Sequence, residues 1–275
     1  MRMNSFRFHP IFQKTLILAG LFLSSLLPLS AQEFQILTNG HAHNDYVHKN
    51  PLHDALTQGM FSIEVDVFLV KGELYVAHTR SGTKKKRRFE DLYIKPLWNI
   101  VNKNGGRVYR DGPLEFEMMI DLKTGGKATL KKVHDLLDEY NGLWTMHYGD
   151  KKIPGAVRVL LSGNGVKYEV QNFDPRFASV DASFKFIDSE LDSNIIPRIS
   201  ANYSSHFIWK GKGEMPEKEL LKLKDWVEKA HLNNRKIRFW NIPQKEAVWQ
   251  VFIDAGVDWI NIDDLKSFRE FILSQ

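Results

Sequence analysis

Short apolar runs alternate with amphipathic segments along most of the chain. The runs are rich in β-branched and aromatic residues and predict strands, near 34–39, 61–69, 73–78, 115–121, 156–162, 178–181, 195–199, 236–240 and 258–262. Helical spacing of apolar residues predicts helices, near 51–59, 89–103, 127–140, 184–192, 216–233 and 244–254. About eight strands with intervening helices predict a parallel α/β fold, the (β/α)8 TIM barrel.

The N-terminus has the pattern of a secretory signal peptide. A basic lead is followed by an apolar run from Thr15 to Leu29, and Leu29-Ser30-Ala31 precedes Gln32. The run is short for a membrane span, although an uncleaved anchor is the alternative. We therefore expect a signal peptide at 1–31, one barrel domain at 32–275, and a periplasmic or extracellular location. The chain has no cysteine and needs no disulfide there.

The charge of the chain does not indicate a nucleic-acid partner. Segment 1–31 holds three basic residues and no acids, so its removal lowers the net charge from +5 to +2. The remaining basic cluster is Lys84-Lys85-Lys86-Arg87-Arg88. Such a run is ordinarily a solvated loop. Its alternative roles are steering an anionic substrate or transient contact with an anionic membrane surface.

Two carboxylates interrupt the apolar run 61–69. Glu64 and Asp66 are two residues apart, so a strand directs both side chains to the same side. Unpaired carboxylates are costly in apolar surroundings unless a cation lies between them. The alternative is a solvated pair, or one bridged by Lys or Arg. Oxygen ligands favour a hard divalent cation, Mg²⁺ or Ca²⁺.

A third carboxylate ends another predicted strand. Asp121 closes an apolar run, and Lys123 follows two residues later on the same side. Asp121 would complete an oxygen cage for the cation. A lysine beside a metal and a carboxylate commonly holds a phosphate as a point charge.

The order His…Glu-x-Asp…His…Asp-Leu-Lys resembles the phospholipase-C-like phosphodiesterase superfamily, which includes glycerophosphodiester phosphodiesterases and spider-venom sphingomyelinase D. Segment 55–67 resembles the helix and strand that lead into the metal ligands of those enzymes. Segment 73–78 resembles the next strand, which ends in a catalytic histidine, here His78. Asp121-Leu122-Lys123-Thr124 is similar to the venom enzymes, where the aspartate binds metal and the lysine contacts phosphate. Glycerophosphodiesterases usually have Glu at that position.

The first histidine has two candidates. His43-Asn44-Asp45-Tyr46 resembles the His-Asn-Thr-Tyr of eukaryotic phosphoinositide phospholipases C, in which the Asn is also a metal ligand. The resemblance implies that His43 is the catalytic base and that Asn44 contributes an oxygen to the cation. The spacing to Glu64 also allows His41 in the catalytic role.

The resemblance resumes near the C-terminus. Segments 237–242 and 255–263 resemble the last two strands of the family, where a Trp and the polar residues after it line the pocket. This implies substrate-binding roles for Trp240 and Asn241, with the indole as a wall for an alcohol or a choline-like cation. A packing role is the alternative for Trp240.

These residues predict an exported, metal-dependent phosphodiesterase. The substrate is expected to be a small-molecule or lipid phosphodiester of the glycerophosphodiester or phospholipid type. His43 would take the proton of the attacking oxygen, and His78 would protonate the leaving oxygen. The resemblance also allows a neighbouring substrate hydroxyl as nucleophile, which would give a cyclic phosphate first.

Two other functions start from the same chain. His41-Ala42-His43 also resembles the first strand of metal-dependent amidohydrolases and of phosphoesterases of the polymerase-and-histidinol-phosphatase type. Those sites need further histidines on middle strands, where His206 is the one candidate, and an acid such as Asp263. The third function is a binding barrel that has lost its chemistry. Retention of the acids, the histidines and Lys123 argues against it.

Overall fold

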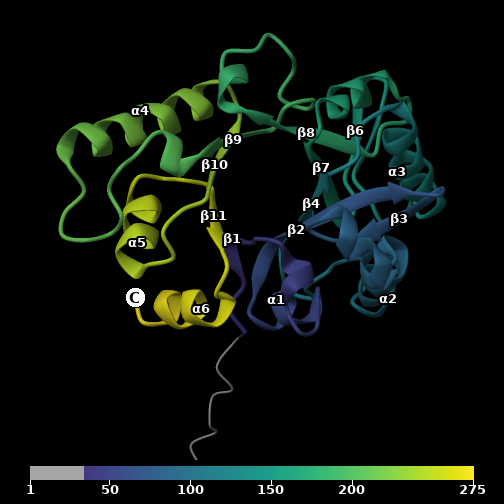
Figure 1. Ribbon diagram of the computed structural model, residues 1–275, viewed down its shortest axis with the longest axis horizontal. Coiled ribbons are helices and arrows are strands. Elements are labelled where there is room, and N and C mark those ends of the chain that lie inside the picture. Colours follow the sequence, from purple (N-terminus) through teal and green to yellow (C-terminus); the bar gives the residue numbers. More distant parts are fainter. Residues whose placement is uncertain (1–33) are drawn as a thin grey trace, which may run out of the picture. The chain divides into compact units, whose positions relative to one another are not determined.

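Eight parallel strands close into a ring (Figure 1). The computed structural model describes residues 34–275, and the predicted signal peptide, 1–31, lies outside them. The strands of the ring are β1 (Leu37–Ala42), β2 (Met60–Val70), β4 (Phe116–Leu122), β7 (Val157–Gly163), β8 (Ala178–Ser183), β9 (Arg198–Asn202), β10 (Lys236–Trp240) and β11 (Trp259–Ile262). β1 pairs with both β11 and β2, which closes the barrel.

Three shorter strands lie outside the ring. β3 (Glu73–Val76) pairs antiparallel with the end of β2 and leads to His78. β5 (Met146–Tyr148) and β6 (Lys151–Ile153) form a separate hairpin between α3 and β7.

Helices surround the ring of strands in Figure 1. They are α1 (His53–Thr57), α2 (Lys95–Lys103), α3 (Lys127–Glu139), α4 (Glu217–Leu232), α5 (Glu246–Asp254) and α6 (Leu265–Leu273). Short 3₁₀ turns replace the α-helices after β7 and β8, namely η4 (Gly165–Asn172) and η5 (Phe184–Phe186). Further short elements are η1 (Asp45–Val47), η2 (Arg80–Lys85), the π-helix η3 (Glu90–Ile94) and η6 (Tyr203–Ser205). In the described part of the chain, no helix combines the length and apolar character needed to cross a bilayer.

The two sides of each strand differ in polarity. Residues such as Ile63, Val65 and Ile120 are fully buried and belong to the apolar core. The alternate positions hold Ser62, Glu64, Asp66, Glu117, Met119, Asp121 and other polar residues, which interact with one another across the barrel. A TIM barrel ordinarily fills its interior with branched apolar side chains. Here the interior is a charged layer that supports the strand ends.

The predicted TIM barrel is confirmed, but the predicted helix at 184–192 is wrong. Only Phe184–Phe186 forms a 3₁₀ turn there. The guanidinium of Arg235 donates to the carbonyl oxygens of Ile187, Ser189 and Leu191 at 2.7 Å each. These are carbonyls that a helix would use internally, so a distant arginine holds the segment in an irregular conformation.

Helix α6 and the strands β5 and β6 were not predicted, and β1 and β9 each begin three residues after the predicted start. Helix α6 was not predicted, although Leu265, Phe268 and Phe271 have helical spacing and Asp264 caps the helix by accepting from the backbone N–H of Ser267 at 3.1 Å. The β5–β6 hairpin was also missed because its strands have only three residues each. Strand β1 begins at Leu37, three residues after the predicted start.

Candidate active site

A cavity of about 420 Å³ opens at the C-terminal ends of the strands. We call one side the acidic wall, formed from β1, β2, β4 and the segments after them: His43, Asn44, Glu64, His78, Asp121 and Lys123. We call the other side the hydroxyl wall, formed from β7, β8, β9 and η4: Ser162, Lys167, Asp181, Ser183 and Ser200. Arg238 and Trp240 of β10 complete the lining. Parallel strands of a barrel bring their ends to one face, where TIM-barrel active sites lie.

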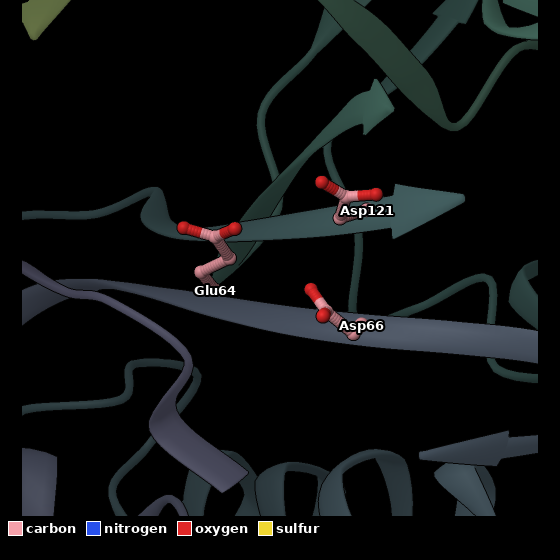
Figure 2. Close-up of side chains that lie close together, drawn as sticks. All are labelled: Glu64, Asp66 and Asp121. Atoms are coloured by element: carbon pink, nitrogen blue, oxygen red, sulfur yellow. The ribbon is translucent and has the colours of Figure 1, made fainter. Parts of the chain in front are cut away.

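Three carboxylates meet at the acidic wall. Figure 2 shows Glu64 and Asp66 on one strand and Asp121 on its neighbour. Asp66 is the register partner of Asp121 in the β2–β4 pair, so two carboxylates lie side by side. One oxygen from each of the three acids lies within 4.8 Å of the others. This acidic triad could hold a metal ion.

The surroundings of the triad fit a hard cation. Asp66 is fully buried, and its Oδ1 atom has no hydrogen-bond partner among residues 34–275. Burial raises the pKa of both Asp66 and Asp121, so their charged forms lack full compensation within the protein. Burial also acts to raise the pKa of Glu64, but Arg238 at 3.2 Å and His41 outweigh it and lower that pKa. A cluster of three carboxylate oxygens, two of which lack full compensation of their charge, suits Mg²⁺ or Ca²⁺.

Lys123 lies at the same place. Its Nζ atom is 3.0 Å from Asp66 Oδ2 and 3.2 Å from Asp121 Oδ2. Burial acts to lower the pKa of this ammonium, but Asp121 and Asp66 raise it above its ordinary value. Lys123 therefore remains a cation beside the acidic triad, where it can attract an anionic substrate.

Gly163 leaves the space that Asp121 occupies. A Cβ at this position would collide with Asp121 Oδ1 and with the backbone of Leu122. The backbone of Gly163 also has φ 75°, a conformation that side chains disfavour. Glycine at the end of β7 thus lets the Asp121 carboxylate face the cavity.

His43 is oriented by an acid from the opposite end of the chain. Its Nδ1 is 2.7 Å from Asp263 Oδ1, the residue that follows β11. The N–H of Nδ1 donates to this carboxylate, which leaves Nε2 as the basic atom, 3.0 Å from Asn44 Nδ2. Asn44 Oδ1 lies 2.9 Å from the Tyr46 hydroxyl oxygen. His43 and Asn44 both line the cavity.

His78 contacts the acidic triad through Asp66. Its Nδ1 lies 3.2 Å from Asp66 Oδ2 and 3.2 Å from the Tyr46 hydroxyl, which itself donates to Asp66 at 2.7 Å. The side chain is 66% exposed, so Nε2 is free to meet a substrate. In the sequence, Tyr46 is distinguished only by its place in the motif that begins at His43. Its hydroxyl joins Asn44, Asp66 and His78, and no strand or helix pattern indicates such a role.

His41 lies beneath the cavity instead of lining it. The side chain is fully buried, with Nδ1 2.7 Å from Ser62 Oγ and Nε2 3.4 Å from Glu64 Oε2. Burial, reinforced by Arg238, holds its pKa well below the usual value, so the ring is neutral. The structure therefore assigns the cavity position to His43.

Of the two predicted substrate-binding residues at the end of β10, one lines the cavity and the other does not. Trp240 lines the cavity with a partly exposed indole. Asn241 does not line it. Its Nδ2 donates to Asn202 Oδ1 at 3.1 Å and to Ser204 Oγ at 2.7 Å, and its φ of 58° turns the chain away after the strand. Asn241 thus fixes the loop after β9 at the rim.

A buried charge network supports the floor of the cavity. Arg198 contacts Glu117 at 2.6 Å and Asp181 at 3.4 Å, while Arg238 contacts Glu64 at 3.2 Å and Asp181 at 3.6 Å. Sequence reasoning missed these residues. The strand periodicity of two could have indicated them. Arg238, for example, precedes Trp240 by two residues and therefore lies on the same side of β10. The network fixes Glu64 from below while its carboxylate faces the cavity.

The basic cluster divides into two parts. Arg87 donates to the carbonyl oxygen of Tyr46 at 2.9 Å, and Arg88 pairs with Glu73 and Glu90. Lys84, Lys85 and Lys86 are exposed on the segment after His78. The arginines stabilise the local structure, and the lysines remain accessible to a ligand.

The acidic triad differs from a His-x-His metal centre. Within residues 34–275, it is the one group of three or more metal-binding side chains found close together, and it contains no histidine. Its oxygen-only composition does not support the amidohydrolase-like alternative, because those centres are rich in histidine.

Comparison with known proteins identifies the family of this chain. A profile of the AIM6-like phosphodiesterase domain matches residues 33–178, just over half of the chain. "Altered inheritance of mitochondria protein 6 homolog" of Arthroderma benhamiae is 26% identical, over 84% of this chain and 82% of that protein. "Altered inheritance of mitochondria protein 6" of Eremothecium gossypii is 28% identical, over 87% and 71%.

Solved structures share the fold at low sequence identity. A glycerophosphodiester phosphodiesterase from Agrobacterium tumefaciens has a TM-score of 0.54 and 14% identity, over 86% of this chain and all of that chain. Another from Parabacteroides distasonis has a TM-score of 0.52 and 14% identity, over 88% and 98%. The superfamily resemblance seen in the sequence is thus confirmed, and the chain belongs to the AIM6-like phosphodiesterase domain family, with the fold of the glycerophosphodiester phosphodiesterases.

Proposed function

We propose that this chain is a divalent-metal-dependent phosphodiesterase acting on a glycerophosphodiester or phospholipid-type diester. The observation that carries the proposal is the acidic triad, with ligand oxygens within 4.8 Å of one another and two histidines and a lysine on the same wall. Glu64, Asp66 and Asp121 would hold Mg²⁺ or Ca²⁺, with the oxygen of Asn44 as a further ligand. Such an ion supplies charge stabilisation to a phosphoryl oxygen.

The two histidines have complementary geometry for acid–base chemistry. His43 presents Nε2 to the cavity because its Nδ1–H is held by Asp263 at 2.7 Å. It would accept the proton of the attacking hydroxyl as the new P–O bond forms. His78, with Nδ1 held by Asp66, would donate a proton from Nε2 to the alkoxide as the old P–O bond breaks. Lys123 would contact a non-bridging phosphate oxygen.

The exposed lysines 84–86 extend this proposal to the approach of the substrate. They follow His78 along the chain, and Lys85 and His78 line one surface pocket. We propose that they raise the local concentration of an anionic diester or an anionic lipid surface, an effect that salt would screen.

The test is turnover of bis(p-nitrophenyl) phosphate and glycerophosphocholine by the full chain, with Mg²⁺, with Ca²⁺ and with EDTA. We expect activity with one of the ions, none with EDTA, and a large loss in Asp121→Asn and His78→Ala. Asp121 is a better target than Glu64, because loss of Glu64 would remove the nearest carboxylate from the buried Arg238 and leave only Asp181, at 3.6 Å, as its ionic partner in the described residues. Activity that persists in EDTA would contradict the proposed mechanism. Absence of turnover on every diester tested would favour a binding barrel.

A further inference from the structure

Lys167 is a buried cation on the hydroxyl wall. It belongs to η4, the 3₁₀ turn after β7, and its side chain lines the cavity although the residue is only 7% exposed. The turn is fixed at its start by Asn164, whose side chain accepts from the backbone N–H of Val166 at 3.2 Å. Lys167 is thus held in place by its own turn and does not reach in from a solvated loop.

The ammonium of Lys167 has no ionic partner among residues 34–275. It forms no ion pair within 4.0 Å and no hydrogen bond there, and it lies over the ring of Tyr168 at 5.5 Å from the centroid. Burial lowers its pKa, and the more distant Asp181 and Asp121 offset this only in part. Lys123, in contrast, touches two carboxylates. A buried charge without a partner is costly, and such groups commonly mark a binding site.

The nearby carboxylate of Asp181 is already engaged. It accepts from Ser200 Oγ at 2.6 Å and lies 3.4 Å from Arg198 and 3.6 Å from Arg238. Both guanidinium groups orient this carboxylate, although each lies closer to another acid, Glu117 or Glu64. Asp181 forms no ion pair with Lys167 within 4.0 Å among the described residues. The charge of Lys167 remains available to a ligand in the cavity, together with the hydroxyls of Ser162 and Ser183 on the same wall.

The scissile phosphate is served by the acidic wall, which has its own cation in Lys123. We propose that Lys167 binds a second anionic group of the substrate, a phosphate monoester or a carboxylate on the alcohol side of the scissile diester. This inference rests on the proposed function and narrows the substrate class. Serine hydroxyls and an ammonium suit oxygen-rich anions. A choline-like head group would place a second cation against Lys167 and would bind poorly.

The test compares diesters that differ by one anionic group. Glycerophosphoglycerol and the same diester carrying a terminal phosphate form the matched pair, and glycerophosphocholine is the cationic counterpart. We expect the wild-type protein to prefer the phosphorylated diester in kcat/KM. Lys167→Gln is expected to lower kcat/KM for that diester by about 10- to 100-fold, the usual range for a lost charged hydrogen bond. For the unphosphorylated diester, kcat/KM should fall by less than about threefold, which is below that range.

Lys127→Gln is the matched control, because this side chain is 85% exposed and does not line the cavity. It should leave the preference unchanged. An equal loss on both diesters in Lys167→Gln would place Lys167 at the scissile phosphate and overturn the proposal. If the wild-type protein turns over neither diester, the proposed function fails. Calorimetric binding of the same pair then decides this inference: tighter binding of the phosphorylated diester, lost in Lys167→Gln, supports it, and equal binding refutes it.

A second readout does not depend on activity. Lys167→Met removes an uncompensated buried charge while keeping an unbranched chain, so the ligand-free variant should have a higher Tm than the wild-type protein. A lower Tm would mean that Lys167 stabilises the fold and is not reserved for a ligand. Lys123→Met provides the contrast, because it breaks two ion pairs.

Discussion

The two walls of the cavity are built on different principles. On the acidic wall the side chains form a mutual network, in which Tyr46 and Lys123 each reach Asp66, and His78 reaches it too. On the hydroxyl wall Lys167 faces the cavity without an ionic partner in the described residues. Groups that perform chemistry need fixed orientations. Groups that select a substrate need unsatisfied charge or hydrogen bonds. The difference indicates that chemistry lies on one wall and selectivity on the other.

The strongest way to break this comparison is to mutate one residue from each wall. His78→Ala is expected to lower kcat/KM by roughly 10²–10⁴-fold, because it removes the general acid. Ser183→Ala on the hydroxyl wall removes one hydroxyl and should cost less than about tenfold. Steady-state kinetics on one diester measures both. Similar losses in the two variants would remove the proposed division of labour.

Metal binding should depend on the acidic wall alone. At an ion concentration one hundred times Kd, Mg²⁺ or Ca²⁺ should stabilise the wild-type protein by about 2.7 kcal/mol. Asp121→Asn is expected to lose most of this stabilisation, while Ser183→Ala keeps it. Thermal denaturation with the ion and with EDTA gives the comparison. Equal stabilisation of Asp121→Asn and wild type would exclude Asp121 as a ligand.

The buried layer beneath both walls should make stability depend on pH. His41 has a lowered pKa in the folded state, so it stays neutral while the unfolded chain takes up a proton below about pH 6.5. Stability is therefore full above that pH and falls as the pH decreases. Between pH 7.5 and 5.0 the wild-type protein should lose about 2 kcal/mol more than His41→Gln. Urea denaturation in EDTA measures this difference, and identical pH profiles would show that His41 accepts a proton in the folded state.

Asp263 provides the finest test, since it acts through another residue. Asp263→Asn replaces the carboxylate that accepts from His43 Nδ1 at 2.7 Å. We expect kcat to fall by about tenfold, equivalent to the loss of one good hydrogen bond. A rise in KM with kcat unchanged would indicate a structural role only.

The acidic wall was largely predictable from the sequence. Strand periodicity fixes the side of Glu64 and Asp66 in one apolar run and of Asp121 and Lys123 at the end of another. Glu64, Asp121 and Lys123 line the cavity, and the buried Asp66 meets them in the acidic triad and contacts Lys123. The barrel followed from the alternation of strands and helices. Only the structure distinguishes His43 from His41. His41 lies within β1 and is buried beneath the cavity, whereas His43 follows the strand and lines the cavity.

The hydroxyl wall was not predictable. Lys167 lies in a turn with no periodic signal, and its position depends on how η4 folds over β7. Asp181 and Arg198 have the right period but reveal their roles only through contacts across the barrel. The same limit applies to segment 184–192, where Arg235, which is far away in the sequence and directly precedes β10, holds the conformation.

Gly163 has a consequence for how such a protein can change over time. Its missing Cβ gives room to Asp121, and its backbone turn begins the segment that carries Lys167. One residue therefore connects the acidic wall, where the reaction is proposed to occur, with the segment proposed to recognise the substrate. Rim loops that carry no site residue can change in related proteins. A change at the end of β7 that alters head-group preference would also disturb Asp121 beside it.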